Sequence, residues 1–164
     1  MLRALSLFTA VILFAGAALA REPLTLKAAD NLPVSADVYR ADAKPDAPWI
    51  VLAHQAGSSR GEYRTIAPRL NKLGFNAIAI DQRSGKAFAG VRNETAQRAA
   101  ARGSKRSYGA AAPDIEAAVA WARRQTTGSV LLWGSSYSAA LALWLAGQNP
   151  ALADAVIAMS PGEY

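Results

Sequence analysis

The chain has 164 residues, no cysteine and a formal charge of +6 at neutral pH. Without thiols, disulfide bonds cannot stabilise it, so the fold depends on burial of apolar surface. The basic balance suits anionic partners, but no nucleic-acid-binding motif is present. No aromatic side chain is interleaved with the basic cluster Arg98, Arg102, Lys105 and Arg106. We interpret this cluster as part of a solvated loop and expect no nucleic-acid partner.

The first twenty residues have the pattern of a secretory signal peptide. Arg3 precedes an uncharged apolar run at 5–19, and Ala18 and Ala20 are the small residues that a signal peptidase requires. The run is short for a membrane span, which needs about 20 apolar residues; an uncleaved anchor helix is the alternative. We expect cleavage after Ala20, export to the periplasm or the medium, and no stable membrane insertion afterwards. Residues 21–164 are then a partial domain.

The predicted strands fall into two groups. Residues 24–28 and 34–39 alternate apolar and polar side chains around a turn, which predicts an antiparallel hairpin with one solvent-facing side. Continuous apolar runs predict four further strands that are buried on both faces. These runs span residues 49–53, 75–80, 129–133 and 155–159.

Helical periodicity lies between the apolar runs. Apolar spacing predicts helices over 63–73, from Pro113 to about 122, and over 139–148, while 81–112 is a long polar connection. Alternation of strands and helices predicts an α/β fold. We expect a mostly parallel sheet with helices on both faces, preceded by two antiparallel strands.

In a parallel sheet of this kind, ligands bind at the carboxyl ends of the strands. Four segments of the chain are predicted to meet there: 54–59, 81–84, 134–138 and 160–164. The candidate site residues are therefore sought in these segments.

Residues 134–138, Gly-Ser-Ser-Tyr-Ser, join a predicted buried strand directly to a predicted buried helix. This is a G-x-S-x-S form of the nucleophile elbow, which places Ser136 in a strained tight turn that projects its hydroxyl into the site. Gly134 and Ser138 are small, as required where the turn brings their backbones together. The helix N-terminus also directs N–H groups and a positive dipole at developing negative charge.

This segment has two other interpretations. A small-residue packing turn in a nucleotide-binding-like fold is the non-catalytic alternative. Ser135 as the nucleophile is rejected, because Trp133 and Tyr137 would then occupy the crowded positions.

The order of elements and the elbow resemble the α/β-hydrolase superfamily, near its dienelactone hydrolase and carboxylesterase-like members, over roughly residues 24–164. Residues 54–59, His-Gln-Ala-Gly-Ser-Ser, resemble the oxyanion loop of that family, with Gln55 in place of the usual glycine. The resemblance implies that the backbone N–H groups of Ala56 and Tyr137 form the oxyanion hole. One such donor contributes about 3 kcal/mol of transition-state stabilisation.

His54 is the only histidine, but in the fold that the chain resembles the base follows the nucleophile in sequence. We therefore expect His54 to orient the oxyanion loop. No histidine follows Ser136, and Glu163 is a candidate acid, with a rim carboxylate as the alternative. Asp81 is expected to pin the loop that follows it, and Asp114 to begin a helix.

The leading hypothesis is a serine hydrolase of ester or related acyl bonds that acts on a small-molecule substrate through an acyl-enzyme at Ser136. Its acid and histidine are expected in a missing C-terminal part, so this fragment alone is expected to be inactive. The alternatives are a non-catalytic binding module or decayed fragment, and the same fold performing acyl transfer or C–C bond hydrolysis. No metal-ligand cluster, phosphate loop or dinucleotide motif is present, so no cofactor or metal is expected.

Overall fold

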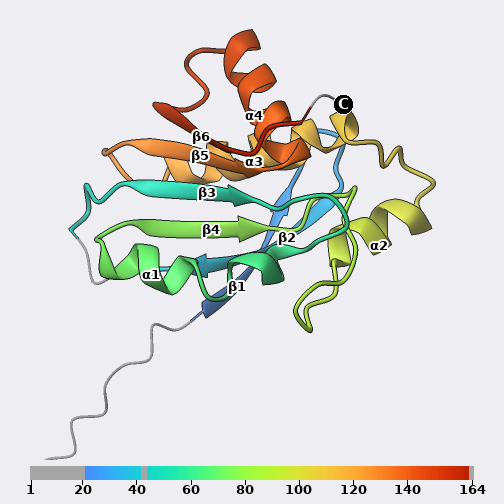
Figure 1. The fold of residues 1–164 in the computed structure, drawn as a ribbon, viewed down its shortest axis with the longest axis horizontal. Coiled ribbons are helices and arrows are strands. Elements are labelled where there is room, and N and C mark those ends of the chain that lie inside the picture. The colour runs from blue at the N-terminus through green and yellow to red at the C-terminus, as the bar shows by residue number, and fades with distance from the viewer. Residues whose placement is uncertain (1–20, 42–43, 163–164) are drawn as a thin grey trace, which may run out of the picture.

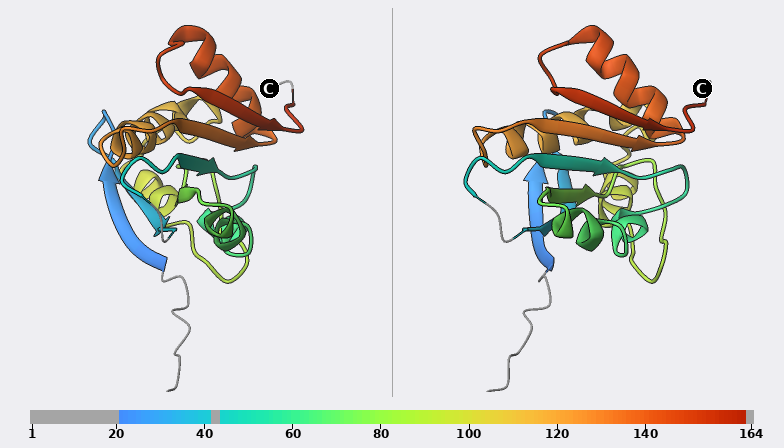
Figure 2. Two further views of the ribbon diagram at one scale, coloured as in Figure 1. Left: turned by 90° about the vertical axis from the view of Figure 1, so that its left-hand side faces the viewer. Right: turned by 60° about the vertical axis from the view of Figure 1, so that its left-hand side comes forward.

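The computed structural model describes residues 21–41 and 44–162. The predicted leader and Glu163 lie outside these residues. The described chain forms one six-stranded sheet in the order β1-β2-β4-β3-β5-β6, with helices on both faces (Figure 1, Figure 2). The strands are β1 (Arg21–Lys27), β2 (Pro33–Tyr39), β3 (Trp49–Ala53), β4 (Asn76–Ile80), β5 (Val130–Ser135) and β6 (Ala155–Met159).

The pairing of the strands confirms the predicted α/β architecture. β1 pairs with β2 and β2 with β4 in antiparallel fashion, whereas β4, β3, β5 and β6 are mutually parallel. All six predicted strands are present, and β5 runs further than expected, into Gly134 and Ser135. This extension carries the sheet directly into the predicted elbow.

The helices agree less closely with the sequence pattern. They are α1 (Ala67–Lys72), α2 (Glu94–Ala101), α3 (Ala112–Arg123) and α4 (Tyr137–Gln148), with 3-10 turns η1 (Arg60–Tyr63) and η2 (Gly109–Ala111). The helix predicted over 63–73 is present but shorter, because residues 64–66 form a turn between η1 and α1. No helix in the described ranges is long and apolar enough to cross a membrane.

Helix α2 was missed, since it lies inside the stretch interpreted as a polar connection. Asn93 caps it by accepting a hydrogen bond from the Ala96 N–H at 2.8 Å, and an alanine-rich run follows. Asn is a favoured N-cap residue and alanine is the best helix former, so the signal was present. Arg98 lies in this helix, and Arg102 follows it, so the basic cluster is partly helical rather than a loop.

Both faces of the central strands are covered. Val51, Ala53 and Ile78 point to the face packed by α3 and α4, whereas Ile50 and Leu52 point to the face packed by α1. Alternate side chains of a strand point to opposite faces, so a continuous apolar run is what a two-sided core requires.

The prediction of a solvent-facing side on the first hairpin is wrong for β2. This strand lies inside the sheet, and its polar residues Ser35 and Asp37 are buried. The Ser35 N–H donates to Thr95 Oγ1 at 2.9 Å, and Asp37 pairs with Arg60. Polar alternation in β2 therefore reflects attachment sites for the helical segments packed on it, not contact with water.

The prediction that 155–159 is buried on both faces is also wrong for the described chain. β6 is an edge strand that pairs only with β5, and both Ala155 and Met159 are exposed. An apolar strand therefore lies at the edge of the described sheet.

Candidate active site

Ser136 lies in the turn between β5 and α4. Its backbone has φ 55° and ψ −119°, a region that side-chain-bearing residues rarely adopt and that costs of the order of 1–3 kcal/mol. The Ser136 N–H donates to the Met159 carbonyl at 2.9 Å, which ties the turn to β6. A Cβ atom at Gly134 would collide with the backbone carbonyl of Ser138 and lie 2.5 Å from the Ala139 nitrogen. The turn therefore has the strain and the crowding predicted for an elbow.

Ser138 is fully buried and explains why serine can stand where the common motif has glycine. Its hydroxyl donates to the His54 carbonyl at 2.5 Å and accepts from Gln82 Nε2 at 2.8 Å. Because His54 follows β3 and Gln82 follows β4, one hydroxyl holds the first turn of α4 against two neighbouring strand ends.

His54 is also fully buried, and both of its ring nitrogens are engaged. Nε2 accepts the Gln82 N–H at 3.0 Å, so Nδ1 carries the proton and donates to the Gln55 carbonyl at 2.8 Å. Burial lowers the pKa of His54 from 6.5 to about 4. The neutral ring thus links the segment after β3 to the end of β4 through two hydrogen bonds. This arrangement suits orientation of the predicted oxyanion loop better than proton transfer.

The predicted oxyanion donors, Ala56 and Tyr137, lie at equivalent positions after two adjacent strands, β3 and β5. β3 and β5 pair Ala53 with Gly134, so each donor lies three residues beyond a paired position. Ala56 is half-buried, and none of the described residues accepts a hydrogen bond from its N–H. Tyr137 is the first residue of α4, where helical N–H groups lack intrahelical partners.

Asp81 pins the segments around the site, as expected. Its buried carboxylate accepts the N–H groups of Arg60 and Glu94, both at 2.9 Å, and pairs with the Arg60 guanidinium. Burial raises the pKa of Asp81, and the bonds from Arg60 and Glu94 oppose this shift. The side chain holds η1 and the start of α2 against the end of β4.

Arg83 and Asp114 form a buried ion pair that sequence reasoning did not find. Asp114 lies in the first turn of α3, where it accepts the Arg83 N–H at 2.9 Å and the Arg83 guanidinium at 2.7 Å. Arg83 also pairs with Asp30 in the β1–β2 turn. Asp114 therefore fastens the loop after β4 to α3 rather than capping its own helix.

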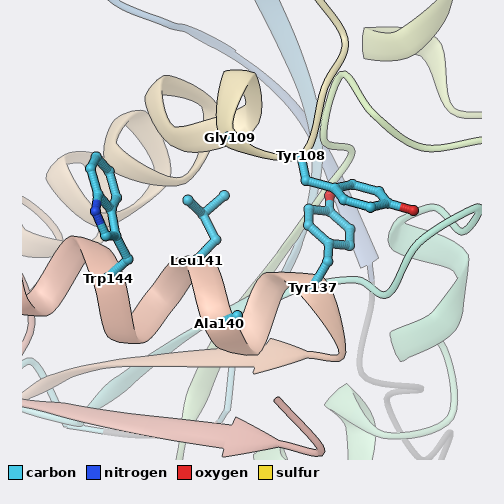
Figure 3. A pocket seen from close by; sticks show the side chains of 6 residues that line it. All are labelled: Tyr108, Gly109, Tyr137, Ala140, Leu141 and Trp144. Atoms are coloured by element: carbon cyan, nitrogen blue, oxygen red, sulfur yellow. The ribbon is translucent and has the colours of Figure 1, made fainter. Parts of the chain in front are cut away.

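Tyr108 is a second missed residue. Its ring stacks on Tyr137 with centroids 4.3 Å apart, and the Tyr137 hydroxyl shares a 2.6 Å hydrogen bond with Ser84. Figure 3 shows both rings at one end of a hollow that runs along α4 towards Leu141 and Trp144. The hollow has a volume of about 250 Å³. An aromatic residue in a polar stretch was the available signal.

The structure gives different information on the candidate acid and on a metal site. Glu163 is not among the described residues. Within residues 21–41 and 44–162, no group of three or more histidine or carboxylate side chains is arranged to hold a metal ion.

A mostly parallel sheet with this strand order, and a serine at positive φ between a strand and a helix, define an α/β hydrolase. Residues 44–163 match the family model described as "Serine aminopeptidase, S33". The chain belongs to this family. No curated protein matches it.

Solved structures show the same fold at low sequence identity. A Pyrococcus furiosus esterase, Pf2001, is 19% identical with a TM-score of 0.64, covering 89% of this chain and 51% of its own. A carboxyl esterase from Bacillus coagulans is 17% identical with a TM-score of 0.64, covering 84% and 43%. A dienelactone hydrolase from Anabaena variabilis is 19% identical with a TM-score of 0.64, covering 84% and 61%. The chain thus spans about half the length of these proteins.

Proposed function

We propose that this protein is an exported serine hydrolase that cleaves ester or related acyl bonds through an acyl-enzyme at Ser136. The observation that carries the proposal is the backbone of Ser136, held at positive φ between β5 and α4. Strain of this kind persists only where the surrounding structure enforces it, and it is concentrated at functional sites. The family match and the esterases among the similar folds support the same chemistry.

In the proposed reaction, the Ser136 hydroxyl attacks the substrate carbonyl and loses its proton to a base. The carbonyl oxygen becomes an oxyanion that accepts hydrogen bonds from the N–H groups of Ala56 and Tyr137. Collapse of this intermediate expels the alcohol, which takes up the proton, and water later releases the acid from Ser136. The N-terminus of α4 stabilises the developing negative charge.

The base and the acid of this reaction are proposed to lie beyond Tyr164. His54 is poorly suited as the base, because its ring is buried and both nitrogens are hydrogen-bonded. Glu163 remains a candidate for the acid. Similar folds of about twice this length support a further segment that supplies the missing groups.

The substrate is proposed to carry a short apolar group. The hollow between Tyr108 and Trp144 begins at Tyr137, the residue next to Ser136, and is lined by aromatic and aliphatic side chains. Its volume of about 250 Å³ is below the usual range for drug-sized ligands, about 300–1,000 Å³. A short acyl or alcohol group suits this size.

Export rests on the pattern of the first twenty residues. The first strand begins at Arg21, so cleavage after Ala20 would leave every described element intact. Amino-terminal sequencing of the protein from a periplasmic fraction tests this, with residue 21 as the expected first residue.

A fluorescent fluorophosphonate, which reacts only with activated serines, tests the catalytic proposal. It is applied to this chain and to any longer in-frame form, each with Ser136→Ala and, as the neighbouring control, Ser135→Ala. We expect labelling of the longer form that is lost in Ser136→Ala and kept in Ser135→Ala. Labelling of the present chain by itself would place the base within these 164 residues.

Failure of both forms to react would favour the second candidate function, a non-catalytic binding module. The observation behind this candidate is that His54, the only histidine of the sequence, is buried and hydrogen-bonded through both ring nitrogens, which suits a structural role better than proton transfer. Such a module would keep the fold and the hollow but not the chemistry.

A further inference from the structure

The positive charge of this protein is concentrated in one segment. Between Lys86 and Arg106 lie six of the 18 Lys and Arg residues and one of the 12 Asp and Glu residues. This segment therefore carries a net charge of +5 out of the +6 of the whole chain. It includes α2 and lies on the side of the sheet to which the arrowheads of β3 and β4 point (Figure 1).

Some of these cations have structural partners, and others do not. Arg98 pairs with Glu94, and Arg102 donates to the Asn31 carbonyl. Lys86 and Arg106 form no ion pair with any residue in the described ranges, although both line the same hollow. Two like charges that face one space repel each other, and a bound anion relieves this repulsion.

The hollow has the form of a small subsite. Its volume is about 290 Å³, with Lys86, Arg106 and Gln97 supplying polar groups. Its apolar lining consists of Ala87, Ala96 and Ala100. Cations and an amide beside an apolar floor suit an anionic group that is attached to a short carbon chain.

The inner end of this hollow adjoins the predicted oxyanion loop. Gly85 and Asn93 line it, and a Cβ atom at Gly85 would lie 2.6 Å from the His54 ring. Asn93 Nδ2 lies 3.2 Å from His54 Nε2. The preceding residue, Ser84, bonds to the Tyr137 hydroxyl, so a single loop separates the hollow from the elbow.

We propose that the hollow between Lys86 and Arg106 binds the carboxylate or phosphate of an anionic substrate whose ester bond is presented to Ser136. This specificity rests on the proposed hydrolase function, but the anion subsite itself does not need a catalytic Ser136. Binding and reaction therefore test the two proposals separately.

The first experiment measures binding of succinate and of inorganic phosphate to this chain by calorimetry at low salt, with uncharged succinamide as the matched ligand. The double variant Lys86→Ala/Arg106→Ala is compared with Lys72→Ala/Arg69→Ala, which removes the same charges from exposed positions on α1. We expect the first pair to weaken anion binding about tenfold and the control pair to leave it within about twofold. Both double variants should unfold at the same temperature as the parent chain.

Equal losses in both double variants would overturn the proposal, because net charge alone would then explain the binding. Binding of succinamide as tightly as succinate, or no binding of either anion, would also overturn it. Binding of the protein to anionic phosphatidylglycerol vesicles, but to neither small anion, would overturn the proposal as well, since the basic surface would then be a membrane-binding surface. Succinate binding without phosphate binding identifies the carboxylate as the ligand, and the reverse identifies the phosphate.

The second experiment uses whichever form of the protein the fluorophosphonate labels. Hydrolysis of 4-nitrophenyl hydrogen succinate is compared with that of 4-nitrophenyl butyrate, which has an uncharged acyl chain of similar length. We expect the ratio of the two kcat/KM values to fall about tenfold in Lys86→Ala/Arg106→Ala and to be unchanged in the α1 control. An unchanged ratio in both variants overturns the substrate assignment even where the serine reacts. Anion binding without any reactive serine would instead overturn the hydrolase proposal and retain the subsite.

Discussion

The part of the sheet formed by β2, β4 and β3 and the part near the β6 edge differ in how they are stabilised. The strands β2, β4 and β3 are covered on both faces, and the loops at their ends are fastened by buried ion pairs around Asp81 and Asp114. β6 at the other edge is only partly buried, and α4 leaves Leu143 and Trp144 exposed. Figure 2 shows β6 and α4 together at that end of the sheet.

Ser136 lies where these two regions meet. Its turn is bonded to β6 through the Met159 carbonyl, whereas Ser138 bonds the same turn to the end of β3. The candidate oxyanion loop thus belongs to the well-buried region, and the turn that carries the candidate nucleophile connects it to the less buried one. Rigid support for the groups that hold a site in place is what preorganised catalysis requires.

The largest difference between the regions is expected from their ion pairs. Arg83→Met leaves the buried Asp114 carboxylate without its guanidinium, which should destabilise the fold by about 3–5 kcal/mol. The matched variant Arg123→Met breaks an exposed pair with Asp154 near β6 and should cost less than about 1 kcal/mol. Urea unfolding of the two variants measures this, and similar losses would refute the distinction.

The same substitution at two leucines compares burial directly. Leu52→Ala in β3 removes a fully buried side chain and should cost about 2–5 kcal/mol. Leu143→Ala in α4 removes one that is 48% exposed and should change stability by less than about 1 kcal/mol. Thermal unfolding checks both values. A loss at Leu143 as large as that at Leu52 would mean that the outer face of α4 is buried in solution.

A pH series tests the contribution of His54, which is fully buried in the well-buried region. The folded pKa of His54, about 4, lies below its unfolded value of 6.5, so protons bind more readily to the unfolded state. The contribution of neutral His54 to the free energy of unfolding is fully present above pH 6.5. It falls as the pH decreases towards 4, and the loss is about 2 kcal/mol at pH 5. Urea unfolding between pH 7 and pH 5 should show this loss, and His54→Asn should reduce it. A loss of the same size in His54→Asn would assign it to other groups.

The smallest expected effect concerns the bond that joins the two regions. Ser138→Ala removes the hydroxyl that bridges His54 and Gln82, which should cost about 1 kcal/mol and lower the rate of fluorophosphonate labelling at Ser136. The control is Ser135→Ala, which removes a hydroxyl from the last residue of β5 and leaves the Ser138 bonds intact. Unchanged stability and labelling in Ser138→Ala would show that the bridge is dispensable.

Much of the fold was predictable because the central strands carry an unambiguous pattern. Runs such as 49–53 have no polar residue, and only a strand covered on both faces buries them. The pattern failed at β2, where Ser35 and Asp37 imitate a solvent-facing strand. It also failed at α2, whose Asn93 cap lies within a polar stretch. At β2, partners distant in sequence decide whether a polar side chain faces water. At α2 the local signal, the Asn93 cap and the alanine-rich run after it, was present and was missed.

The candidate site also has features that the sequence predicts and features that it does not. The elbow around Ser136 was found from sequence because small residues at fixed spacing are a local requirement of the tight turn. The bond from the Gln82 N–H to His54 Nε2, the ion pair of Arg83 with Asp114, and the stacking of Tyr108 on Tyr137 were not found. Each depends on residues that lie more than 20 positions apart and meet only when the loops pack.

The sequence by itself determined the α/β class, the order of the strands and of every helix but α2, and the serine in the elbow, because periodicity and turn sterics act over a few neighbouring residues. Tertiary structure alone decided which polar groups are buried, which strand lies at the edge, and that Lys86 and Arg106 share one hollow. Burial and charge proximity depend on distances in space, and no local pattern of residues specifies those distances.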